Sequence, residues 1–172
     1  GATTAPTFEG SGELNIYGST ILQNGMTYSV TSTRFRTTDA ATITTNGVSM
    51  GTNYSQVIYL NGAGSLTLLD DFSTNGQILL QKGTFNTNDK NVTFYTLTSA
   101  YNTGSKVLNL GASNLYSTTP YNAAINTLAP DLTLNAGTSH VHVSGSLNND
   151  VSVQYKGGDN FYDITFEEPN AT

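Results

Sequence analysis

Two apolar β-type motifs recur about 41 residues apart in a chain rich in Thr, Ser, Asn and Gly, a spacing within the range of known structural repeats. Residues 65–72 (SLTLLDDF) return as residues 106–113 (KVLNLGAS), and residues 43–47 (ITTNG) return 42 positions later as residues 85–89 (FNTND). A near-constant offset shared by two different motifs indicates a repeated structural unit. Repeats of this size are typical of solenoids, propellers and arrays.

The composition predicts a folded all-β protein rather than a disordered chain. Only 10% of the 172 residues are charged, yet 37% are hydrophobic, and 10 Tyr and 7 Phe supply aromatic rings. Disordered segments lack the aromatic and β-branched residues that strands favour. The polar surface must then consist of Thr, Ser and Asn. Many extracellular, cell-surface and virion proteins have such a surface, and we expect one of those locations.

Charge and hydropathy exclude two classes of partner. The net charge is −6 with only six Lys plus Arg, whereas nucleic-acid binding needs clustered positive charge. No nucleic-acid partner is therefore expected. Because no apolar run approaches the roughly 18 residues of a membrane-spanning helix, no membrane insertion is expected either.

Short runs of alternating apolar and polar residues, separated by turn residues, predict β-strands along most of the chain. Four Asn-Gly pairs punctuate the first half, at residues 24–25, 46–47, 61–62 and 75–76. Asn-Gly is a strong hairpin signal, which would favour an antiparallel β-sandwich or jelly roll. The same two residues also turn the corners of a parallel coil, because both tolerate positive φ.

The repeat favours the second of these folds, an all-β parallel β-helix, or β-solenoid. Two coils of about 20 residues would produce the observed offset, whereas a sandwich gives no reason for local sequence to recur at a fixed distance. Right-handed winding is expected from the rule for parallel crossovers. The antiparallel β-sandwich or jelly roll is the alternative.

We expect residues 1–172 to form a single β-solenoid domain or a fragment of a longer array. Residues 117–130 interrupt the pattern, since they contain two prolines and an Ala-rich stretch. This segment is predicted to be an irregular loop that projects from one coil. Loops on rigid scaffolds often carry binding residues.

Residues 43–47, 64–72, 78–88 and 106–111 together carry a resemblance to known proteins. They are similar to the Thr/Gly/Asn-rich repeat modules of large secreted bacterial surface proteins and of phage tail and fibre proteins. The resemblance implies a parallel β-solenoid that occurs in tandem, and residues 159–166 look like the strand that opens a further unit. It covers about half of the chain and brings no catalytic residue with it.

Tyrosine is the residue type that most suggests a ligand surface in this chain. Its ring stacks on sugars while its hydroxyl group stays hydrated. Tyr116 and Tyr121 lie at the start of the irregular segment and are the leading candidates, and Tyr95 and Asn122 complete the predicted site. Structural stacking of aromatic side chains along a parallel sheet is the alternative.

Two adjacent pairs of side chains have the chemistry of metal ligands. Asp70 and Asp71 follow a predicted strand and could bind calcium or act as an acid–base pair, although a strand-end turn also explains them. His140 and His142 flank Val141 on one face of a strand, roughly 7 Å apart. They could hold zinc with a third ligand from a neighbouring coil, although exposed surface histidines are the simpler interpretation.

Asp159 and Asp163 form a third candidate group, beside a Gly-Gly pair near the end of the chain. Their spacing lacks the alternating ligands and central glycine of an EF-hand loop, so a solvated face is the alternative to a calcium site. No other cofactor is expected.

The sequence as a whole predicts a non-enzymatic structural or adhesive module that extends or displays a surface. Because a solenoid leaves bare sheet edges at its ends, its expected partners are another copy or a neighbouring module, together with a cell-surface glycan. A carbohydrate-binding module on a β-sandwich is the alternative. A polysaccharide-degrading β-helix enzyme is a third candidate, and the few carboxylates show no catalytic arrangement to support it.

Overall fold

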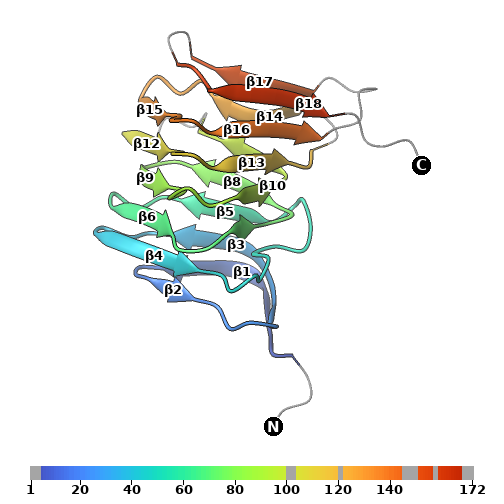
Figure 1. Cartoon of the computed structure of the whole chain (residues 1–172). Helices are drawn as coiled ribbons and strands as arrows, with labels where there is room; N and C mark the ends of the chain where they lie inside the picture. The colour runs from blue at the N-terminus through green and yellow to red at the C-terminus, as the bar shows by residue number, and fades with distance from the viewer. Residues whose placement is uncertain (1–4, 100–103, 120–121, 145–150, 157–158, 168–172) are drawn as a thin grey trace, which may run out of the picture.

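The computed structural model describes residues 5–99, 104–119, 122–144, 151–156 and 159–167, and their strands form one parallel β-solenoid (Figure 1). The chain winds through about six turns, and three sheets run along the stack. Every strand pair in the described residues is parallel. The predicted parallel β-solenoid is therefore confirmed, and the antiparallel sandwich or jelly roll is wrong.

The strands form three sheets, here named A, B and C, and sheet C begins later in the stack than the other two. Sheet A consists of β1 (Thr7–Ile16), β3 (Thr27–Phe35), β5 (Val57–Leu60), β8 (Gln77–Leu80), β11 (Thr96–Thr98), β14 (Asn122–Thr127) and β17 (Val151–Tyr155). Sheet B consists of β2 (Thr20–Ile21), β4 (Ala40–Thr44), β6 (Ser65–Leu68), β9 (Gly83–Asn86), β12 (Lys106–Asn109) and β15 (Leu132–Asn135). Sheet C consists of β7 (Phe72–Ser73), β10 (Val92–Phe94), β13 (Asn114–Ser117), β16 (His140–Ser144) and β18 (Asp163–Glu167).

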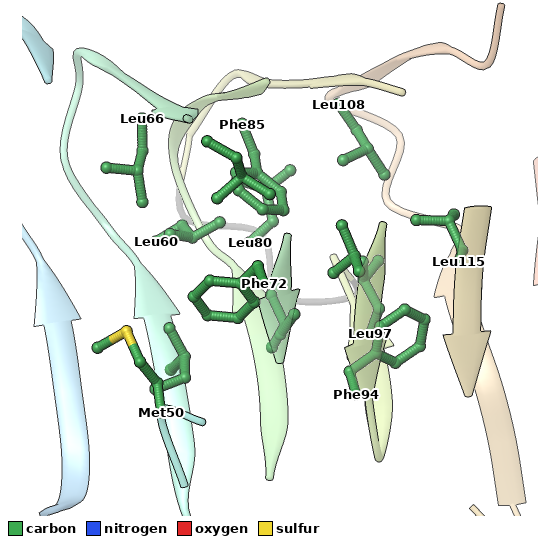
Figure 2. Close-up of a cluster of buried hydrophobic side chains, with 14 of the residues drawn as sticks. Met50, Leu60, Leu66, Phe72, Leu80, Phe85, Phe94, Leu97, Leu108 and Leu115 are labelled. Atoms are coloured by element: carbon green, nitrogen blue, oxygen red, sulfur yellow. The ribbon is translucent and has the colours of Figure 1, made fainter. Parts of the chain in front are cut away.

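The core lies inside the coil, where alternate residues of all three sheets meet. In β6, for example, Leu66 and Leu68 are buried while Ser65 and Thr67 face outward. Figure 2 shows such apolar side chains projecting into the space between the sheets. Successive strand residues point to opposite faces, so the two-residue period of the sequence places one set inside and the other on the surface.

The repeat seen in the sequence is a stack of turns. Leu66 of β6 lies beside Phe85 of β9, which in turn lies beside Leu108 of β12. The offset read from the sequence aligned Leu66 with Val107 instead, one position short of its true partner in the column. Leu66 and Leu108 are both buried, whereas Val107 faces outward. A slip of one residue would turn the strand over, so burial of the leucines fixes the register.

The Asn-Gly pair at residues 46–47 turns a corner between sheets and does not close a hairpin. Asn46 and Gly47 both have positive φ, 50° and 77°, and the Asn46 side-chain amide donates to the Leu22 carbonyl one turn earlier, at 2.7 Å. Asn88 does the same two turns later, with φ of 54° and a 3.0 Å bond to the Leu68 carbonyl. The side chain therefore ties each corner to the one below it.

Turn length varies along the stack, whereas coils of about 20 residues were expected. Thr67 and its register partner Asn86 are 19 residues apart, but Asn126 and its partner Gln154 are 28 residues apart. The segment expected to be an irregular loop, residues 117–130, contains β14, which pairs in parallel with β11 and β17. Ala124 and Ile125 are fully buried, and their burial keeps this Ala-rich stretch in sheet A.

Glycines form the corner between sheets A and B, where adjacent turns touch through their backbones. A Cβ on Gly83, which has φ of +82°, would come closer than 3.0 Å to the carbonyl oxygens of Gly62 and Gly64. A Cβ on Gly62 would in turn meet the backbone of Thr37. At Gly62 and Gly83, the corner therefore has no room for a side chain.

Candidate functional site

The outer face of sheet C carries the largest group of predicted site residues. Val141 and Val143 of β16 are buried, so His140 and His142 between and beside them face outward, as the alternation predicted. Tyr116 of β13 is the register partner of His142, which brings a predicted ligand residue against a predicted metal ligand.

The three rings of Tyr116, His140 and His142 form one group, here called the Tyr–His stack. The Tyr116 and His142 rings are stacked with centroids 4.6 Å apart and an interplanar angle of 15°. The His140 and His142 rings are stacked with centroids 4.1 Å apart at 18°. One face of the Tyr116 ring is therefore covered by an imidazole, and Tyr116 as a whole is half-buried, with Thr93 as its register partner on the other side.

Both histidines hold the last strand of sheet C. His140 Nε2 lies 2.8 Å from the Thr165 hydroxyl and 3.3 Å from an Asp163 carboxylate oxygen. His142 Nδ1 lies 2.7 Å from a Glu167 carboxylate oxygen. The polar contacts of the stack thus connect β16 to β18.

A row of side-chain amides continues this face toward the start of the chain. The Asn114 amide donates to the Asn91 side-chain oxygen at 3.0 Å, and the Asn91 amide donates to Asp71 at 3.0 Å. The outer face of sheet C therefore combines amides, a phenol ring and hydroxyl groups. Such a surface can exchange hydrogen bonds with a hydroxyl-rich ligand.

The other predicted ligand residues do not all gather beside Tyr116. The Tyr95 ring, just after β10, packs against the Tyr54 ring with centroids 5.7 Å apart. Asn122 begins β14 in sheet A, and Tyr121 lies outside the described residues. Nothing in the sequence indicated Tyr54 as the ring partner of Tyr95, because the loop that carries it comes from an earlier turn.

Asp70 and Asp71 form hydrogen bonds to opposite neighbouring turns of the stack. The Asp70 carboxylate accepts the backbone N–H groups of Thr45 and Asn46 in the turn below, at 2.8 and 2.6 Å. The Asp71 carboxylate accepts the Asn91 backbone N–H in the turn above, at 2.9 Å. Each carboxylate thus satisfies backbone donors at a corner, and the two do not face a common site.

Asp159 and Asp163, the third candidate pair, make contacts with different partners. Asp163 is engaged with His140, whereas the Asp159 backbone N–H donates to the Lys156 carbonyl at 3.0 Å. Among the residues that the structure describes, no group of three or more His, Cys, Asp or Glu side chains is arranged to hold a metal ion. The calcium and zinc sites expected from the sequence therefore stay predictions, and the described residues provide no preformed set of ligands for them.

The pair that sequence reasoning missed is Lys106 with Asp131. The Lys106 side chain is fully buried at the corner that opens β12, and its Nζ donates to the Asp131 carboxylate at 2.6 Å and to the Gly104 carbonyl at 3.2 Å. The hydrogen bond from Lys106 holds the pKa of the Asp131 carboxyl below its ordinary value of 3.8. Only the register of β12 with β15 brings these two residues together, so no local motif announces the pair.

We expect the two partners of this pair to respond unequally to substitution. Asp131→Ala leaves a buried ammonium group with no counter-charge, so it should be the more destabilising of the two substitutions. Lys106→Met removes the charge from the core and leaves Asp131 partly exposed to water, so its effect should lie within about 1 kcal/mol. Urea denaturation of both variants checks the order, and a smaller loss for Asp131→Ala would contradict it.

The same pair gives a pH dependence of defined sign. Because the folded-state pKa of Asp131 is lowered, its contribution to stability is present above pH 3.8 and is lost as the pH falls through the folded-state value. Lys106→Met removes this contribution. The free energy of unfolding of the variant should therefore fall less steeply below pH 4 than that of the wild type.

A second cation organises the outer face of sheet A near the start of the stack. The Arg34 guanidinium lies 3.8 Å from the centroid of the Tyr59 ring and pairs with Glu13. The hydrogen bond from Arg34 lowers the pKa of the Glu13 carboxyl. Arg36 also lies near Glu13, at 3.6 Å, so both arginines serve contacts between neighbouring turns.

Comparison with known proteins identifies no relative of this chain. No protein-family model, curated protein or solved structure matches the chain. Within the described residues, no helix has the length and apolar character needed to cross a membrane.

Proposed function

We propose that this protein is a non-enzymatic structural module of an extracellular, cell-surface or virion assembly, which extends or displays a surface as a rigid rod. The observation that supports this most directly is the uninterrupted parallel stacking of turns along three sheets. In such a stack, the backbone groups of each turn pair with its neighbours, and length grows with the number of turns.

Side-chain ladders on the outer face of sheet B support a rigid role. The Asn86 amide donates to the Thr67 hydroxyl at 3.1 Å, the Asn109 amide donates to Asn86, and the Asn135 amide donates to Asn109 at 2.7 Å. These bonds link four successive turns at one position. Because each amide both donates and accepts, the ladder couples neighbouring turns without burying charge.

The use made of the acidic side chains supports a non-enzymatic role. Asp70 and Asp71 bind backbone donors, and Asp89 accepts the Ala112 backbone N–H at 2.7 Å. A glycan-cleaving pair needs two carboxylates that flank one bond. The contacts of these three carboxylates instead hold corners together.

A distance measurement between two labelled turns tests the rod. Ala40 of β4 and Thr133 of β15 are exposed and occupy one column of sheet B, four strands apart. The chain has no Cys, so Ala40→Cys with Thr133→Cys gives two spin-label sites. We expect one narrow distance distribution, with the Cα atoms roughly 19 Å apart at about 4.8 Å per strand. A broad distribution would contradict a rigid module.

Glycan recognition by the outer face of sheet C is the second candidate function, and the combination of Tyr116 with Asn114 and Asn91 favours it. A glycan array, screened with and without calcium, tests it. We expect a specific signal that falls at least tenfold in Tyr116→Ala, while Tyr17→Ala, which removes a 71% exposed ring far from this face, leaves it unchanged. The Tyr121→Ala variant tests the second tyrosine that the sequence predicts as a ligand residue.

A blank array under both conditions would leave the module as a spacer without glycan recognition. A signal that appears only with calcium would instead support a calcium site at the predicted carboxylate ligands, among them Asp70 and Asp163.

A further inference from the structure

The first turn of the described solenoid leaves its apolar interior open. A groove of about 330 Å³ lies there, lined mainly by Phe8, Leu14, Ile16, Ile21, Leu22 and Met26. Ile21 is 77% exposed and Phe8 is 45% exposed, although both belong to strands. Figure 1 shows β1 and β2 as the outermost strands at this end of the stack.

The opposite end is open as well. β17 and β18 are the last strands of sheets A and C, and they lie together at the far end in Figure 1. Tyr155 is 44% exposed and Phe166 is 52% exposed, and Val153 is only half-buried. Within the described residues, each end therefore presents an apolar surface beside an unpaired strand edge, an arrangement that favours pairing with another chain.

We infer that the occupant of the first-turn groove is the last turn of a second copy of this chain, so that β17 of one copy pairs in parallel with β1 of the next. This inference deepens the proposed role as an extending module and rests on it. The contact is head-to-tail and continues sheet A along the axis of the stack, so its repetition does not close into a ring and produces an open filament.

The register of sheet A supports this particular match. Two adjacent columns of side chains run through the sheet from β1 to β17. They begin at Leu14 and Asn15 and end at Val153 and Gln154. A second copy placed in register sets leucine over valine on the inner face and asparagine over glutamine on the outer face. The hydrogen bond from the Asn126 side-chain amide to the Gln154 side-chain oxygen, 3.0 Å long, would then be followed by a similar bond into the next copy.

Charge favours this contact over symmetric pairing of like ends. β1 carries Glu9 and Glu13, and Arg34 already pairs with Glu13, so two paired β1 strands bring together two Glu9 carboxylates that make no ion pair within the described residues. Two antiparallel β18 strands paired over their full length set Asp163 opposite Glu167, and like charges directly opposite destabilise a strand pair. β17 contains no acidic residue, and Lys156 follows it. The Glu9 carboxylate of β1 therefore meets a strand without acidic residues only in the head-to-tail arrangement.

Two variants, each blocked at one end, test the inference. Leu14→Lys places an inward charge on β1, and Val153→Lys places one on β17, a device that protects strand edges from pairing. We expect the wild-type mass in sedimentation velocity to rise with concentration beyond a dimer. Each variant alone should stay at its monomer mass of about 18.2 kDa. A 1:1 mixture should form a dimer and stop there, since only one intact pair of ends remains.

Three outcomes would overturn the inference. A wild type that stays monomeric at every concentration excludes end pairing. A dimer formed by Val153→Lys alone shows symmetric pairing through β1, and a dimer formed by Leu14→Lys alone shows symmetric pairing through the other end. If either lysine variant lacks the β-sheet circular dichroism of the wild type, Asn15→Pro and Val153→Pro replace them as edge blocks, because the backbone N–H groups of these two residues point away from the neighbouring strand.

The spin-label distances and the glycan array are measured on the monomeric Leu14→Lys chain as well. If the copies do not pair end to end, the spin-label distances and the glycan binding are unaffected. If the module is not rigid, the spin-label distance distribution is broad even in the monomer.

Discussion

Gly83→Ala is expected to destabilise this protein by about 3–4 kcal/mol, as a methyl group enters the backbone contact between turns. Gly83 has φ of +82°, a conformation that costs alanine about 1–2 kcal/mol. The added Cβ would also approach the Gly62 and Gly64 carbonyl oxygens closer than 3.0 Å. Relief of that clash requires β9 to move away from β6, which would weaken a strand pair. Urea denaturation followed by circular dichroism measures the loss.

Gly12→Ala is the matched control for this substitution. Gly12 lies in the edge strand β1, and a Cβ there would meet nothing within 4 Å. We expect its free energy of unfolding to stay within about 0.5 kcal/mol of the wild type. Equal losses of stability in the two glycine variants would show that the close approach of adjacent turns does not restrict which residues fit at position 83.

Phe85→Ala is expected to cost about 3–5 kcal/mol, because it empties a position in the middle of the stacked core. Phe85 is 2% exposed and lies between Leu66 and Leu108 in one inward column. Figure 2 shows its ring among the side chains of neighbouring turns. Since the backbone of a stacked turn is held by ladders above and below, the cavity should not collapse fully. Urea denaturation measures this loss as well.

Phe85→Leu separates loss of volume from loss of the aromatic ring. It keeps most of the apolar volume, so its cost should stay below about 1.5 kcal/mol. Tyr17→Ala, at an exposed position, should fall within about 0.5 kcal/mol of the wild type. A loss for Phe85→Ala no larger than that of Tyr17→Ala would contradict the position of this ring in the core.

Much of the coil could be derived from local pattern. The alternation in residues 65–68 and 140–144 coincides with the inner and outer faces in the structure, because a strand exposes every second side chain. The Asn-Gly pair at 46–47 was compatible with a hairpin or with a corner, since positive φ serves both. The repeat favoured the corner, and the parallel pairs on either side confirm it.

The candidate site was only partly accessible from the sequence. The outward direction of His140 and His142 followed from Val141, but the stacking of Tyr116 on His142 depends on the register between β13 and β16, which lie in different turns. Asp70 and Asp71 were adjacent in sequence and looked like a pair. Their opposite hydrogen bonds depend on which turn lies above and which below, and local sequence carries no record of this.

By itself, the sequence determined the kind of fold: all β, coiled in parallel, with apolar residues inside and amides and hydroxyls outside. These properties depend on short-range periodicity and on a repeat, and both are visible along the chain. Only the tertiary structure decided the unequal lengths of the turns, the strand formed by residues 122–127, and the burial of Lys106 against Asp131. The physical reason is that register between turns is set by packing and by ladders across a whole turn of chain, where many local patterns fit equally well.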